Sequence, residues 1–93
     1  MDGFPASNAY GVSKAAVIML TRTLACDLAR YSLRVNAVAP GFIEAPMASR
    51  LSDRADISEE AFRRRTPLGR LGQVDEVARV VAFLASGWAS YVT

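Results

Sequence analysis

The pattern of hydrophobic and polar residues predicts one long helix near the start of the chain. It runs from about Ala9 to Arg30, and Ser7 or Asn8 is its expected N-cap, because such side chains accept hydrogen bonds from the free N–H groups of a first helical turn. One stripe along this helix is apolar and is formed by Val17, Ile18, Leu24, Ala25 and Leu28. The opposite side is also mostly small and apolar, with Val12, Ala15, Ala16, Met19 and Cys26. A helix that is apolar on both sides is expected to be sandwiched between two layers.

Two extended segments are expected after this helix. Leu33–Ala39 is the best strand candidate, and Pro40-Gly41 ends it. Ser90–Thr93 has the character of the beginning of a further strand. Because a helix that leads directly into a strand is half of a parallel α/β unit, the pattern predicts an α/β fold.

Two shorter helices are expected in the second half of the chain. Phe42–Asp56 is interpreted as a long irregular connection, after which Ser58–Arg65 forms a short helix with Ser58 at its start. A turn at Thr66–Arg70 precedes a third helix, Val74–Ser86, and Gly87 is placed to end it.

The long helix carries a pair of residues with chemical potential, Tyr10 and Lys14. They lie four residues apart, which places both side chains on one helix face and close enough to interact, and Lys14 is the only lysine of the chain. A tyrosine with the usual pKa of about 10 is a poor proton shuttle at neutral pH. A cation about 5 Å away stabilises a tyrosinate by up to ~3 kcal/mol at an effective dielectric constant of about 20. The spacing therefore favours a tyrosine that acts as a general acid/base.

Composition and charge narrow the class of protein. With 93 residues, 52% hydrophobic and 22% charged, the sequence is that of at most one small globular domain. The net charge of +2 is too small to indicate nucleic-acid binding, and no apolar run approaches the length of a membrane span. A single cysteine and the lack of a signal-peptide pattern predict a cytoplasmic protein without an internal disulfide. No metal site is expected.

Five segments together resemble the C-terminal part of a short-chain dehydrogenase/reductase. Their order and spacing match that family across essentially the whole chain, and they are Gly3-Phe4-Pro5, Tyr10–Ala16, Arg34–Gly41, Pro67–Arg70, and Phe83–Ser86 followed by Ala89–Thr93. The resemblance implies the C-terminal part of a Rossmann-like, doubly wound parallel sheet with a truncated last strand. Residues 1–93 are accordingly expected to form a partial NAD(P)-binding domain whose N-terminal cofactor-binding half is absent.

The resemblance also implies an activity, that of an oxidoreductase that transfers a hydride between NAD or NADP and a carbonyl or alcohol substrate. Tyr10 is the implied general acid/base, and Lys14 would assist it and bind the hydroxyls of the nicotinamide ribose. The nicotinamide side of the cleft would be lined by Pro40, Gly41 and Ile43. Phe42–Arg65 would be the variable region that closes over a small-molecule substrate.

Other parts of the family's machinery are expected outside these residues. In this interpretation the glycine-rich dinucleotide loop, the Asn-Ala-Gly segment and the catalytic serine lie upstream of Met1, and the end of the last strand follows Thr93. Ser7 is interpreted as a helix cap and not as that serine. Ala45 stands where many relatives carry a threonine that hydrogen-bonds the cofactor. The 93 residues alone are therefore expected to lack dehydrogenase activity.

Ordinary structural roles stay open for several residues. Tyr10 and Lys14 are also compatible with a partly buried pair without catalytic function, and Lys14 alone with Schiff-base chemistry. Arg63–Arg65 is interpreted as a solvated helix end and not as a phosphate or nucleic-acid contact. Asn36 is expected to be buried and to satisfy backbone groups of a loop. Cys26 is expected to pack, and packing or interface roles are expected for Trp88 and Tyr91.

A second class of function is a non-catalytic piece that oligomerises. Here the helix over 9–30 packs against copies of itself, and in the enzyme family the corresponding helix commonly forms a subunit interface. The expected partners are thus a small-molecule carbonyl or alcohol substrate and further copies of the chain, with neither nucleic acid nor membrane. The identity of the substrate and the choice between NAD and NADP stay open.

Overall fold

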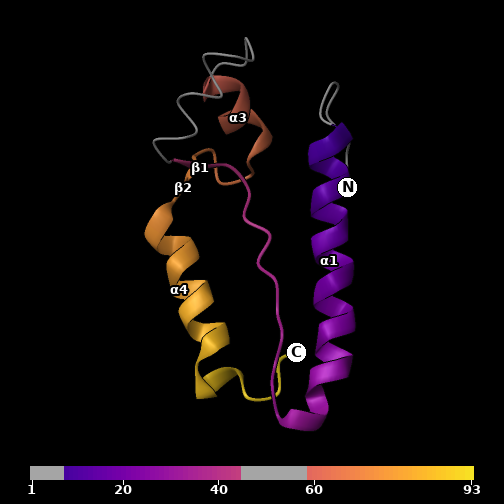
Figure 1. The fold of residues 1–93 in the computed structure, drawn as a ribbon. Helices are drawn as coiled ribbons and strands as arrows, with labels where there is room; N and C mark the ends of the chain where they lie inside the picture. The colour runs from indigo at the N-terminus through magenta and orange to yellow at the C-terminus, as the bar shows by residue number, and fades with distance from the viewer. Residues whose placement is uncertain (1–7, 45–58) are drawn as a thin grey trace. The chain divides into compact units, whose positions relative to one another are not determined.

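The computed structural model describes residues 8–44 and 59–93 (Figure 1). The described residues form two compact units, one made of residues 8–37 together with Ala89–Thr93, the other of the described part of Val38–Trp88. Some sequence predictions fall outside the described residues: the capping roles of Ser7 and Ser58, the Gly3-Phe4-Pro5 segment, the residue at Ala45, and the connection beyond Glu44.

The first unit contains the long helix that the sequence predicts. Helix α1 spans Asn8–Leu28 and continues as a 3₁₀ turn over Ala29–Tyr31. Ser32 then adopts a left-handed backbone conformation with φ of 58°, and its N–H donates to the carbonyl of Ala29 at 2.9 Å. This reversal ends the helix and lets residues 33–37 run back alongside α1 (Figure 1).

The two apolar sides of α1 are much more exposed than predicted. Ile18, Leu24 and Leu28 of the predicted stripe are half-buried. On the opposite side, Val12 is 70% exposed and Met19 is 57% exposed. None of the described residues covers the Val12 side of α1, so the second layer that the sequence predicts over this side, another helix or a subunit, stays a prediction.

The extended segment at Leu33–Ala39 is not a strand, contrary to prediction. Its partners are the last two residues of the chain. The N–H of Val35 donates to Oγ1 of Thr93 at 3.0 Å, and Nδ2 of Asn36 donates to the carbonyl of Val92 at 2.8 Å. A β-ladder needs backbone-to-backbone bonds, and these contacts use side chains. The residue pattern therefore predicted an extended segment correctly. It was wrong in predicting that this segment pairs as a β-strand.

The second unit holds a short parallel sheet whose two strands lie at positions that the sequence analysis did not predict. Strand β1 is Ile43–Glu44 and strand β2 is Gly72–Gln73, paired in parallel so that Ile43 faces Gly72 and Glu44 faces Gln73. The N–H of Gly72 donates to the carbonyl of Phe42 at 2.9 Å. β1 lies in a stretch interpreted as irregular, because two residues are too few to show an alternating pattern. The α/β class with a parallel sheet is confirmed.

Two helices complete the second unit. Helix α3 spans Glu59–Arg65, and its Phe62 ring packs against Phe42 with 4.3 Å between ring centroids. The predicted turn follows, with Gly69 at a φ of +66° that glycine adopts without steric cost. Helix α4 spans Val74–Ala85.

Ser86, and not Gly87, ends helix α4. The backbone of Ser86 is extended, and both its N–H and its hydroxyl donate to the carbonyl of Phe83, at 3.1 and 2.7 Å. Gly87 instead begins a 3₁₀ turn over Gly87–Ala89. The end of the helix was predicted within one residue, but the capping residue was wrong.

Candidate active site

Tyr10 and Lys14 lie together on the first two turns of α1. Nζ of Lys14 is 5.4 Å from the centroid of the Tyr10 ring, within the range of a cation–π contact. The predicted proximity of the two side chains is confirmed. The local geometry is reinforced by Ser13, whose hydroxyl donates to the carbonyl of Tyr10 at 2.7 Å.

The side chains of Tyr10 and Lys14 are both exposed on the surface of the first unit. Tyr10 is 66% exposed, and Lys14 is also exposed. An exposed phenol and an exposed ammonium on one helix face can both donate hydrogen bonds to a bound molecule. The phenolic oxygen can also accept a hydrogen bond, so one face of α1 offers both a donor and an acceptor.

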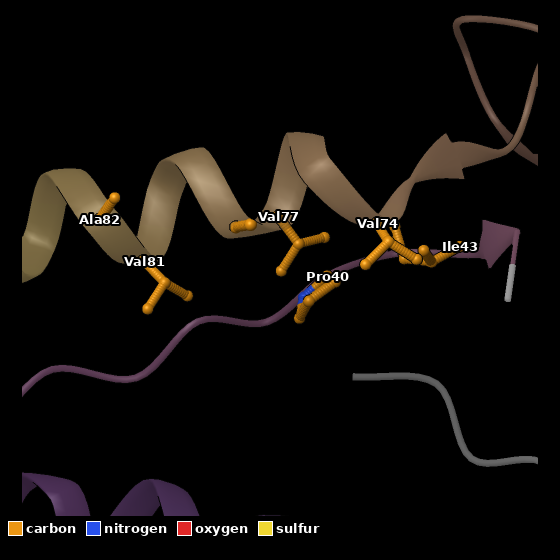
Figure 2. A pocket seen from close by; sticks show the side chains of 7 residues that line it. Pro40, Ile43, Val74, Val77, Val81 and Ala82 are labelled. Atoms are coloured by element: carbon orange, nitrogen blue, oxygen red, sulfur yellow. The ribbon is translucent and has the colours of Figure 1, made fainter.

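Pro40 and Ile43 line an apolar groove in the second unit. The groove has a volume of about 530 Å³ and is completed by residues of α4, namely Val74, Val77, Ala78, Val81 and Ala82. Figure 2 shows the side chains of Val74, Val77 and Val81 pointing toward the segment that carries Pro40 and Ile43. Gly41 lies between these two residues and is exposed, with open space where a side chain would be.

The candidate residues thus fall into two groups. Tyr10 and Lys14 belong to the first unit, whereas Pro40, Gly41 and Ile43 belong to the second. Within each unit the structure brings the predicted residues together: the tyrosine with the lysine, and Pro40 with Ile43.

A polar cluster at the start of α4 was missed by the sequence analysis. Arg70 donates two hydrogen bonds to the carboxylate of Glu76, at 2.8 and 2.7 Å. The same carboxylate accepts the backbone N–H of Gln73 at 2.8 Å, and Nε2 of Gln73 donates to the carboxylate of Glu44 at 2.7 Å. A glutamate three residues after the N-cap is the signal of a capping box. It was overlooked because the capping position holds Gln73 and not one of the usual serine, threonine, aspartate or asparagine residues.

The hydrogen bonds from Arg70 and from the Gln73 backbone lower the pKa of Glu76 from an ordinary 4.5 to about 2. Because the pKa is lower in the folded chain, the stabilisation from this carboxylate is complete above pH 4.5 and is lost as the pH falls toward 2.

We expect Glu76→Gln to lower the thermal midpoint of unfolding at pH 7, and the difference from the unchanged chain to shrink between pH 4.5 and pH 2. The matched control is Glu60→Gln, which removes an exposed ion pair with Arg64 and should change the midpoint little. A destabilisation of equal size at pH 7 and pH 2 would contradict this account of Glu76. Circular dichroism at the helix band measures both.

The structure also gives the exposure and the contacts of the other residues that the sequence analysis singled out. Asn36 satisfies a backbone carbonyl as predicted but is only half-buried. Arg63–Arg65 are exposed in the last turn of α3, in agreement with a solvated helix end. Three residues expected to pack or to lie in an interface are exposed in the described structure: Cys26, Trp88 and Tyr91.

The part of the chain that the structure describes contains neither a membrane-spanning helix nor a cluster of metal-binding side chains. None of its helices combines the length and the apolar character needed to cross a membrane. Its His, Cys, Asp and Glu side chains form no group of three or more that could hold a metal ion.

Comparison with known proteins gives the family. A family model described as enoyl-(acyl carrier protein) reductase matches residues 1–93. The chain is 52% identical over 91 residues to the 3-oxoacyl-[acyl-carrier-protein] reductase FabG of Thermotoga maritima, a match that covers 98% of this chain.

Solved structures agree with this match. A short chain dehydrogenase family protein from Francisella tularensis superposes with a TM-score of 0.85 at 33% identity over 98% of this chain. ElxO with NADP bound superposes with a TM-score of 0.83 at 36% identity over 99% of it. The chain belongs to the short-chain dehydrogenase/reductase family, whose Rossmann-like fold it shares in part. It spans 36% of the length of the Thermotoga reductase, 41% of the Francisella chain and 37% of ElxO.

Proposed function

We propose that this chain supplies the acid/base machinery of an NAD(P)-dependent oxidoreductase that acts on a small carbonyl or alcohol substrate. The observation that carries the proposal is the contact between Tyr10 and Lys14 in a chain of this family, with both side chains exposed on one face of α1. NADP bound to the similar structure ElxO supports the same class of cofactor here.

The residues present fit the nicotinamide end of such a cofactor. When bound, a nicotinamide dinucleotide supplies or accepts the hydride. Tyr10 donates its phenolic proton to the oxygen of the reduced carbonyl and takes a proton back in the reverse direction. Lys14 stabilises the phenolate left on Tyr10, and its ammonium can also donate to hydroxyl groups of the nicotinamide ribose.

The second unit, considered by itself, offers an apolar surface with the chemistry that a nicotinamide ring needs. Pro40 and Ile43 offer apolar contacts to one side of the nicotinamide, and Gly41, without a side chain, allows close approach of the backbone. We further propose that the 93 residues have no dehydrogenase activity by themselves. Their sequence contains no glycine-rich loop that could bind the phosphates of the dinucleotide. A cytoplasmic location is part of the same proposal.

The experiment is an exchange of segments. In the Thermotoga maritima reductase, the matching 91 residues are replaced by the corresponding residues of this chain, giving what we call the exchange enzyme. The exchange enzyme should reduce a 3-oxoacyl substrate with NADH or NADPH, whereas the 93 residues alone should not. An exchange enzyme that folds and binds cofactor but does not turn over would refute the proposal.

The exposed apolar side of α1 favours a second candidate function, self-association. Val12 and Met19 offer large apolar side chains to a partner, and such surface is favourable to bury. In this alternative, copies of the chain pack through α1 without catalysis. A mass that rises with concentration and does not respond to NAD or NADP would support it, whereas stabilisation by the cofactor supports the enzymatic function.

A further inference from the structure

Four polar side chains link the end of β1 to the first turn of α4. Glu44 accepts a hydrogen bond from the side-chain amide of Gln73, the backbone N–H of Gln73 donates to Glu76, and Glu76 is held by two hydrogen bonds from Arg70. We call these four residues the clamp. All four belong to the second unit, so the clamp connects the two strands and the helix within one compact body.

The short sheet needs such a link. Two residues per strand make very few backbone hydrogen bonds, and sheets this small are marginal in water. Glu44 and Gln73 face each other in the register, so their side-chain bond lies at the end of the strand pair. At the other paired position the two strands approach closely, because a Cβ on Gly72 would lie 2.7 Å from Cδ1 of Ile43. A slip of the register would break both features.

We propose that the clamp is a positioning device for the nicotinamide-lining segment Pro40–Ile43, with Glu44 and Gln73 as its coupling pair. This inference rests on the proposed function, because the proposed function is what assigns contact with the nicotinamide to Ile43. Ile43 precedes Glu44 directly, and its side chain lines the same groove as that of Val74, the residue after Gln73. Fixing Glu44 to Gln73 therefore fixes the wall of the groove next to Ile43. None of the clamp residues is a catalytic residue.

The chemistry of the coupling pair allows a rescue experiment. Gln73→Glu places a second carboxylate 2.7 Å from that of Glu44, so a hydrogen bond becomes a like-charge contact at pH 7. Adding Glu44→Gln to the same chain restores the hydrogen bond with donor and acceptor exchanged. The two variants differ by one amide group, so a loss that the double variant repairs is assigned to this pair and not to general misfolding.

The first readout is hydrogen exchange at the amide of Gly72 in β2, which donates to the carbonyl of Phe42, the residue before β1. In the 93-residue chain, Gln73→Glu should speed this exchange by about tenfold, and the double variant should return it to within about threefold of the unchanged chain. Asp75→Asn is the control, because it removes an exposed ion pair with Arg79 on α4 and should leave Gly72 unaffected. Unchanged exchange in Gln73→Glu would overturn the clamp.

The second readout is cofactor affinity in the exchange enzyme. Gln73→Glu should raise the Kd for NADP(H) by about fivefold to tenfold, with a smaller change in kcat at saturating cofactor, and the double variant should restore the affinity. Faster exchange at Gly72 with unchanged affinity would overturn the positioning role. An exchange enzyme that neither binds cofactor nor turns over would overturn the proposed function and that role with it, while exchange at Gly72 still decides whether the clamp exists.

Discussion

Replacing Tyr10 with Phe in the exchange enzyme is expected to lower kcat by about 10²–10⁴-fold and to leave the affinity for NADP(H) within about twofold. The size of the loss is that of a missing general acid/base, since a phenyl ring keeps the shape of the side chain but has no proton to transfer. The ring also keeps its contact with the Lys14 ammonium, which lies 5.4 Å from its centroid. The Tyr10→Phe variant is therefore expected to bind NADP(H) normally and to lose most of its turnover.

The matched control for Tyr10→Phe is Tyr31→Phe. Tyr31 follows the same helix, is 60% exposed, and has a cation of its own, because the Arg30 guanidinium lies 4.8 Å from its ring centroid. Tyr31→Phe should leave kcat and Kd unchanged. Near-normal turnover in Tyr10→Phe, or an equal loss in both variants, would contradict the assignment of Tyr10 as the acid/base. Steady-state kinetics and a cofactor titration measure both quantities.

Replacing Lys14 with Met is expected to lower kcat/KM at neutral pH by up to about 10²-fold. Methionine removes the positive charge of Lys14 while it keeps much of the length of the side chain, so Tyr10 loses the cation that lies 5.4 Å from its ring centroid. Cofactor affinity should also fall, because the ammonium is lost as a donor to the ribose.

Lys14→Arg and Arg30→Met separate charge from position. Arginine keeps the positive charge but not the compact ammonium, so Lys14→Arg should recover part of the rate. Arg30→Met removes the cation beside Tyr31 and should leave kcat/KM unchanged. An unchanged kcat/KM in Lys14→Met, or an equal loss in Arg30→Met, would contradict a role for the lysine in the reaction.

The helices were predictable because each one carries its signal in its own residues. The 3.6-residue periodicity and the turn residues gave α1 and α4 to within about two residues at each end, and the Tyr10–Lys14 contact followed from helical spacing alone. The strands were not predictable in the same way. Leu33–Ala39 has the composition of a strand, but a strand exists only where a neighbour accepts its backbone hydrogen bonds.

The contact between Tyr10 and Lys14 was predictable because it is local, whereas the contact between Glu44 and Gln73 was missed because it is not. The Glu44–Gln73 bond joins residues 29 positions apart, and no periodicity links them. Their contact depends on the parallel pairing of β1 with β2, which is itself only two residues long. The exposure of the Val12 side of α1 could not be predicted from the local pattern of residues either. An apolar helix face indicates that a surface is suited to burial, but it does not indicate which residues cover it.

The most direct test of the central claim is the single-turnover rate of hydride transfer in the exchange enzyme, because it measures the chemical step apart from product release. If this chain supplies working acid/base machinery, the rate lies within about tenfold of that of the unexchanged reductase and falls when Tyr10 is replaced by Phe. A folded exchange enzyme that binds NADP(H) but transfers hydride no faster than its Tyr10→Phe variant would contradict the claim.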